Sequence, residues 1–237
     1  KEGASWWNQA YEAAGYKDAF QVKVLPEGAD PMDVRYNVIN WVHRATRGWS
    51  YGSSVVDPRT GEIIKGHVTL GSLRVRQDYL IALGLTSPFK EGNTDTTAQQ
   101  EMALDRIRQL SAHEVGHTLG IAHNFAASEN NRASVMDYPH PKISIKNGKI
   151  SLEGAYDKGI GAWDIHAVEY GYQDFASDVE EAEALAKIIV KGRNEGLSFK
   201  SDPDTRSSRH ASANGHMWEN GSNPLDAFDE ISQVREL

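Results

Sequence analysis

The sequence predicts an α/β (α+β) fold in which short strands come first, one long helix follows, and irregular structure with further helices completes the chain. Two local patterns support this order. Apolar and polar residues alternate in several stretches before residue 71, as they do in half-buried strands. A helical pattern without proline then runs from Thr97 to Leu119, and turn-forming residues interrupt the chain after Gly120.

Composition indicates a globular protein with one sizeable core. The chain has 237 residues, 39% of them hydrophobic and 24% charged, which leaves room for an appendage to that core. A net charge of −8 argues against nucleic acid as a partner, because no basic stripe can neutralise phosphates. No apolar run is long enough to span a membrane, and the chain starts at a lysine, so we expect it to be part of a longer multidomain chain.

The absence of cysteine limits the chemistry further. It excludes disulfides, thiolate metal ligands and a cysteine nucleophile within these residues. A metal site in this chain must therefore be built from imidazole and oxygen ligands.

The expected elements before the long helix are short. They are a helix over residues 5–14, strands over 20–24 and 34–42, a hairpin over 54–64 and a helix over 73–83. Thr97 and Gln100 have the spacing of a capping box at the start of the long helix.

Beyond the long helix, the pattern predicts a hairpin over residues 143–152 around Asn147-Gly148, helices over 163–172 and 177–193, and a polar tail. Asp202 and Asp204 lie in this tail. Their spacing lacks the glycine and the distal glutamate of a calcium loop, so we expect a solvated segment there.

The stretch HEVGHTLGIAHN, from His113 to Asn124, carries the strongest chemical signal. Residues four apart on a helix differ by about 40° in direction, so His113 and His117 project side by side and can share one metal ion. Imidazole pairs suit Zn²⁺. Glu114 stands beside that metal position, where a general base for an activated water is needed.

Gly120 separates this motif from a bare HExxH. A glycine three residues after His117 takes a left-handed conformation at little cost, so the chain can end the helix and reverse. The reversal returns His123 to the same ion as a third ligand. Three protein ligands leave one position open, which is typical of a catalytic zinc site.

The segment Ser134-Val135-Met136-Asp137-Tyr138 places a methionine in a turn shortly after His123. Together, the HExxHxxGxxH motif and this segment resemble the metzincin clan of zinc endopeptidases. The stretches WWNQAYEAAGY, DPRTGEIIKG and VMDYPHP are similar to a bacterial metzincin family found in longer multidomain proteins. This narrower resemblance covers nearly the whole chain.

The resemblance implies a zincin-like metzincin fold. A twisted mixed sheet would lie over the active-site helix, and Met136 would form a hydrophobic base beneath the metal. The catalytic domain would span residues 1–175, divided into an upper subdomain (1–120) and a lower one (121–175). Residues 176–237 would form a helical and polar C-terminal extension. The family also implies an extracytoplasmic location: secreted, periplasmic or in the cell envelope.

The function implied is that of a zinc-dependent endopeptidase acting on a protein or peptide substrate, with Glu114 as general base. The alternative is a non-catalytic, zinc-stabilised protein-binding module, which would have no need of a carboxylate at Glu114. The sequence leaves two roles open for Tyr138. Its spacing from Met136 is similar to that in astacins and serralysins, where a tyrosine reaches the metal and the oxyanion; in matrixins, the tyrosine after the methionine has no such role.

Two further expectations concern the substrate cleft. We expect residues 51–56 to be the exposed edge strand against which a metzincin substrate binds, extended and antiparallel, and the hairpin over 143–152 to wall the pocket on the primed side of the scissile bond. The remaining histidines are expected to be solvated or hydrogen-bonded rather than ligands, although His140 follows the methionine turn closely; they are His43, His67, His140, His166, His210 and His216.

Overall fold

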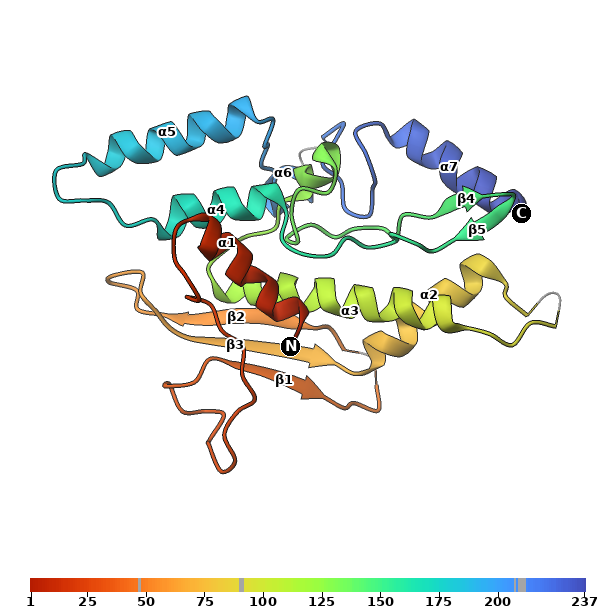
Figure 1. The fold of residues 1–237 in the computed structure, drawn as a ribbon, viewed down its shortest axis with the longest axis horizontal. Coiled ribbons are helices and arrows are strands. Elements are labelled where there is room, and N and C mark those ends of the chain that lie inside the picture. The colour runs from red at the N-terminus through yellow and green to blue at the C-terminus, as the bar shows by residue number, and fades with distance from the viewer. Residues whose placement is uncertain (47, 90–91, 207, 209–211) are drawn as a thin grey trace.

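The computed structural model describes residues 1–46, 48–89, 92–206, 208 and 212–237. A small sheet lies on one side of the long helix α3 (Thr97–Thr118), and most of the later elements lie on its other side (Figure 1). This arrangement confirms the predicted mixed fold with a sheet over a long helix. Within the described segments, no helix is both long and apolar enough to cross a membrane.

The sheet has three strands, β1 (Val38–Val42), β2 (Tyr51–Val56) and β3 (Ile63–Gly71). Their order is β1-β3-β2, with β1 parallel and β2 antiparallel to β3, so the sheet is mixed as expected. β3 is the central strand and carries most of the buried residues. β2 is an edge strand, because no strand in the described chain pairs with its other side.

Small residues allow β2 and β3 to lie close to α3. A Cβ on Gly52 would overlap the carbonyl oxygen of Glu114, and one on Gly66 would press against the side chain of Thr118. The Ser54 hydroxyl donates a hydrogen bond to the Thr118 carbonyl at 2.7 Å. The edge strand is therefore fixed directly beside the helical turn that bears Glu114.

The N-terminal segment crosses α3 and supplies much of the core. A 3₁₀ turn, η1 (Gly3–Trp6), leads into α1 (Trp7–Ala13), close to the predicted helix. Trp7 is fully buried, and its indole N–H donates to the carbonyl of Ala112 in α3 at 2.8 Å. Because a buried indole needs a partner for its N–H, this bond fixes α1 against the active-site helix.

The other predicted helices and the hairpin are present at approximately the expected positions; they are α2 (Leu73–Thr86), β4 (Ser144–Lys146), β5 (Lys149–Ser151), α4 (Ala162–Tyr172) and α5 (Glu181–Asn194). Three further elements were not predicted: η2 (Phe125–Asn130), α6 (Asp202–Thr205) and α7 (Pro224–Glu236). α2 packs beside α3, α4 packs on α1, α5 packs on α4, and α7 lies near the β4–β5 hairpin (Figure 1).

Three local predictions were wrong. Residues 20–24 form no strand: Phe20 stacks on Tyr11 of α1 and Val24 is exposed, so the alternation reflects packing on a helix. The strand predicted over 34–42 begins only at Val38. At the start of α3 there is no capping box, because the carboxylate of Asp95 accepts the Thr97 N–H at 2.9 Å and takes the capping role.

Candidate metal centre and its cavities

α3 and the turn after it bring the three predicted histidines together. His113 and His117 lie one helical turn apart, and Gly120 takes a left-handed φ of 81°, which reverses the chain toward His123. One ring nitrogen of each histidine lies within 4.8 Å of those of the other two. The Nε2 atoms of His117 and His123 are 3.2 Å apart.

The other ring nitrogen of each histidine faces an oxygen acceptor. Nδ1 lies 2.8 Å from Val135 O in His113, 2.9 Å from Ile121 O in His117 and 2.6 Å from Asp202 Oδ2 in His123. These contacts favour the proton on Nδ1, which leaves the three Nε2 lone pairs free to bind a shared cation. Nitrogens bound to a tetrahedral zinc at about 2.0–2.1 Å lie roughly 3.3 Å apart, so the 3.2 Å spacing fits this ion.

Burial keeps the ligands neutral. His113 is almost completely buried, and desolvation together with the neighbouring His117 lowers its pKa well below the usual value. Desolvation also lowers the pKa of His117. Since zinc binds the neutral imidazole, this environment favours the metal-binding form at neutral pH.

The predicted methionine turn lies directly beneath α3. Met136 is fully buried, and a Cβ on Gly116 would overlap its sulfur, so helix and turn are in close contact. The turn is fixed by Asp164 of α4, whose carboxylate accepts from the Ser134 hydroxyl at 2.6 Å and from the Val135 N–H at 2.8 Å. Asp164 thus holds the segment whose Val135 carbonyl orients His113.

Glu114 lies on α3 next to His113 and is nearly buried. Desolvation raises its pKa to about 7, whereas a backbone hydrogen bond from Gly52 and the charge of Arg106 act in the opposite direction. The N–H of Gly52 thus connects the edge strand β2 to this carboxylate. A carboxyl group with a pKa of about 7 can both accept and release a proton at neutral pH.

Tyr138 lies against two of the three histidines. The centroid of its ring is 5.3 Å from that of His113 and 4.6 Å from that of His123. The Trp218 ring stacks on the Tyr138 ring with centroids 5.3 Å apart. The backbone N–H of Trp218 also donates to the Tyr138 carbonyl at 3.0 Å. The C-terminal extension therefore covers the tyrosine that follows the methionine turn.

A cavity of about 950 Å³ opens beside Glu114 and Tyr138. It extends along α3 toward the N-terminus of that helix and is walled by α2, by Trp49 and Ser50 before β2, and by Met217 and Trp218. The predicted wall, the hairpin over 143–152, lines a different cavity near the start of α3, so that prediction was wrong. Met217 and Trp218 occupy the place expected for it, although the hairpin register (Ile145 opposite Ile150) is as predicted.

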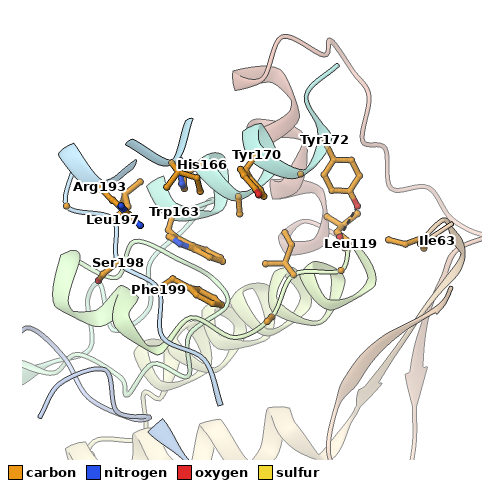
Figure 2. A pocket seen from close by; sticks show the side chains of 18 of the residues that line it. Ile63, Leu119, Trp163, His166, Tyr170, Tyr172, Arg193, Leu197, Ser198 and Phe199 are labelled. Carbon is orange, nitrogen blue, oxygen red and sulfur yellow. Dashed lines mark hydrogen bonds between the residues drawn. The ribbon is translucent and has the colours of Figure 1, made fainter. Parts of the chain in front are cut away.

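A second cavity, of about 1380 Å³, lies at the other end of β2 (Figure 2). Its walls include Val56, the turn over residues 120–122, and side chains from α4 and the segment after α5. Trp163 and Phe199 stack in parallel within it at 5.5 Å. The two cavities therefore meet opposite ends of the edge strand, one on each side of the metal centre.

The segment after α5 is not a solvated tail, which corrects that prediction. Asn124, next to His123, donates to the Ser198 carbonyl at 2.9 Å, and the Phe125 N–H donates to the Lys200 carbonyl at 2.8 Å. These bonds hold the start of α6 beside the third histidine. Asp202 consequently contacts His123 and is part of the metal centre's surroundings.

The other histidines lie outside the triad. In the described part of the chain, the three predicted ligands form the one group of histidine and acidic side chains with metal-binding spacing. The Nδ1 atom of His140 lies 3.0 Å from the Pro141 carbonyl, and His67 lies 3.0 Å from the amide nitrogen of Asn40. His210 is outside the described residues.

Sequence reasoning missed four residues around the site: Asp164, Asp202, Trp218 and Gly52. For two of them, Asp164 and Asp202, the sequence contains a local helix-capping pattern. Asp164 stands three residues after Gly161 at a helix start, and Ser201 with Asp204 forms a capping box that marks α6. The stacking of Trp218 and the close approach at Gly52 join distant segments and leave no local pattern.

A histidine triad on a helix beneath a mixed sheet, with a methionine turn below it, defines the class of zincin-type zinc metallopeptidases. Comparison with known families agrees. The model of the Met-zincin family (DUF4953) matches residues 95–237, more than half of the chain, and the chain belongs to this family. No curated protein and no solved structure gives a significant match. The metzincin resemblance is thereby confirmed, and the family implies zinc as the metal.

Proposed function

We propose that this chain is a zinc-dependent endopeptidase with His113, His117 and His123 as metal ligands and Glu114 as general base. One observation carries the proposal: three Nε2 atoms face a common point while Glu114 lines a cavity beside them. A site kept for folding alone would not require a nearly buried carboxylate there, because burying an acid is costly.

Zinc, when bound, supplies Lewis acidity that makes water more acidic and polarises the scissile carbonyl. The carboxylate of Glu114 takes the proton of the attacking water and later delivers it to the leaving amine nitrogen, while the hydroxyl oxygen joins the carbonyl carbon. Glu114 thus returns to its starting form. Its hydrogen bond from Gly52 keeps the carboxylate oriented through both transfers.

The substrate would lie extended along β2. This strand has a free edge in the described chain and is fixed to α3 beside Glu114, and a cavity lies at each of its ends. Main-chain hydrogen bonds to such an edge bind a peptide irrespective of its side chains, and the cavities would accept side chains on either side of the cut.

The test is cleavage of an unfolded protein substrate by zinc-loaded protein, with and without chelator, beside the variant Glu114→Gln. We expect chelator to abolish cleavage and zinc addition to restore it. The variant should retain zinc and its folded circular-dichroism spectrum while losing at least about 99% of turnover, as expected when a general base is removed. Cleavage by the variant at a tenth of the parental rate would overturn the role of Glu114.

The alternative, a protein-binding module that uses zinc for stability, gives a different result. Such a module would show no chelator-sensitive cleavage of any substrate, and Glu114→Gln would leave partner binding unchanged. No feature of the described structure favours this reading over the peptidase.

A further inference from the structure

The cavity beside Glu114 is strongly cationic, although the whole chain has a net charge of −8. Glu114 is the one acidic residue among its lining residues, against four arginines: Arg74, Arg76, Arg106 and Arg206. Two of these arginines are neutralised. Arg74 pairs with Asp78 at 2.9 Å, and Arg206 pairs with Asp202 at 2.9 Å.

Arg106 is the exception, because it is buried without a carboxylate partner. Its exposed fraction is 3%, and no acidic side chain in the described chain lies within salt-bridge distance of it. Its Nε has no hydrogen-bond partner. Its contacts are a hydrogen bond to the amide oxygen of Gln109 and the face of the Tyr156 ring, 5.6 Å from the guanidinium carbon.

Helix geometry places this guanidinium within the substrate cavity. Arg106, Leu110 and Glu114 are spaced four residues apart on α3, so they face the same side, and all three line the cavity. Two helical turns separate Arg106 from Glu114, about 12 Å along the axis. Both side chains line the cavity and each acts on the other electrostatically, so an acidic side chain that follows the cut can extend from the metal centre toward the guanidinium.

Burial of an unpaired charge is unfavourable, because its hydration is lost without compensation. Asp78 lies near enough to influence Arg106, but its carboxylate is shared with Arg74, so two guanidinium groups face one acid. Glu114 also acts on Arg106 electrostatically, but no carboxylate in the described residues forms a direct ion pair with this guanidinium. A carboxylate from a bound molecule would form that pair and would also satisfy the free Nε.

We infer that the cavity beside Glu114 binds a substrate carboxylate through Arg106, an inference that rests on the proposed peptidase function. The planar guanidinium matches a carboxylate in a two-point hydrogen-bonded pair, which is stronger and more directional than a contact with a neutral amide. A peptide antiparallel to β2 would have its residues after the cut at the Tyr51 end of that strand, where this cavity lies. Two sources present a carboxylate there: an acidic side chain, or the free carboxyl end of a substrate that terminates after the cut.

Cleavage of matched peptides tests the inference first. One peptide has Glu directly after the cleaved bond, and its partner has Gln there. We expect kcat/KM to favour Glu by about tenfold or more, because a site with an unpaired polar group discriminates against a substrate that leaves it unpaired. Arg106→Met should reduce the ratio to near one, and Arg106→Lys should retain part of it.

Arg76→Met is the matched control, since it removes an equal charge from an exposed position on the same cavity wall. It should leave the Glu-to-Gln ratio within about threefold of the parental value, because exposed charges are screened by solvent. Equal losses in the two variants would assign the preference to the general field of the cavity and overturn the role of Arg106. Absence of any Glu preference in the parental protein would overturn the inference itself.

The second source of carboxylate needs its own pair of peptides. In both peptides the residue after the cleaved bond is Gln, and this Gln is the last residue. One peptide ends in a free carboxylate and the other in an amide. A tenfold preference for the free acid that Arg106→Met removes would identify the chain terminus as the group bound. A preference in the Glu pair alone would identify the side chain.

Product binding separates this inference from the proposed function. Trp49 and Trp218 line the cavity, so their fluorescence reports occupancy. Zinc-loaded protein should bind the tripeptide Glu-Ala-Ala about tenfold more tightly than Gln-Ala-Ala, and Arg106→Met should bind both equally. This result would support the carboxylate site even if no peptide were cleaved, whereas equal binding by the parental protein would contradict it.

Discussion

The carboxylate of Asp202 lies 2.6 Å from Nδ1 of His123, although 79 residues separate the two in the chain. Asp202 begins α6, in the C-terminal extension, and its second oxygen accepts from Arg206. Trp218, from the same extension, stacks on Tyr138. The metal centre is therefore completed by residues well beyond the methionine turn, and we propose that the extension acts as part of the catalytic unit.

Asp202→Ala should weaken zinc binding by about 10–100-fold, because loss of a group that orients a metal-bound histidine typically has this effect. Asp202→Asn should recover part of the affinity, since its amide oxygen can still accept from Nδ1. Competition with a chromogenic chelator measures both. Asp178→Ala removes an equal charge from an exposed site and should leave affinity unchanged; equal affinity in Asp202→Ala would show that the contact does not position His123.

Tyr138→Phe tests the two readings of this tyrosine. We expect kcat to fall by about 100-fold with zinc content unchanged, which is the cost of losing one donor to a developing oxyanion. The ring lies against His113 and His123, so Tyr138 is close to the metal position at which a substrate carbonyl would be polarised. A kcat equal to the parental value would place this protein with the matrixin pattern, in which the tyrosine has no such role.

Gly116→Ala should destabilise the protein by about 1–3 kcal/mol, the usual cost of overfilling a packed core. The added methyl would overlap the Met136 sulfur and the Trp7 ring, both fully buried. Gly84→Ala in α2 is the matched control, because its Cβ meets nothing within 4 Å. That helical substitution should stabilise by roughly 0.5–1 kcal/mol. Urea unfolding compares the two, and a shift of both midpoints in one direction would contradict this account of the helix–turn contact.

The ligand set could be predicted from the sequence because it depends on local geometry. His113 and His117 share a helix face, and Gly120 reverses the chain to bring back His123 within eleven residues of the first ligand. Helical period and the left-handed preference of glycine are sufficient for this inference. The hairpin register followed equally from a two-residue Asn147-Gly148 turn.

Contacts between distant segments could not be predicted in this way. In the sequence, Arg106 looks like any other charged residue of an amphipathic helix. Its burial against α2 and Tyr156 depends on contacts between distant segments. Phe20 and Val22 alternate as strand residues do, yet no strand lies beside them. The hairpin was expected at the primed pocket from its place in the chain alone, but that position is occupied by Met217 and Trp218.

Asp164 should give the protein a measurable loss of stability as pH rises. Its carboxyl is fully buried, and desolvation raises its pKa to about 6, against hydrogen bonds from Ser134, Val135 and Gly161 that act to lower it. Below about pH 4 the group is protonated in both the folded and the unfolded chain, so its contribution to stability is fully present. Between about pH 4 and 6 the unfolded chain ionises first, and the folded state loses up to about 3 kcal/mol relative to it.

The measurement is the difference in unfolding free energy between the parental protein and Asp164→Asn, taken at each pH from 4 to 8. Taking the difference cancels the titration of every group whose surroundings are the same in the two proteins. The asparagine does not titrate. The unfolding free energy of the parental protein should therefore fall relative to that of the variant from pH 4 to 6, and the difference between them should be constant above pH 6. A difference that stays constant over the whole range, or one that moves in favour of the parental protein, would mean that Asp164 is ionised in the folded state and that its three hydrogen bonds outweigh its burial.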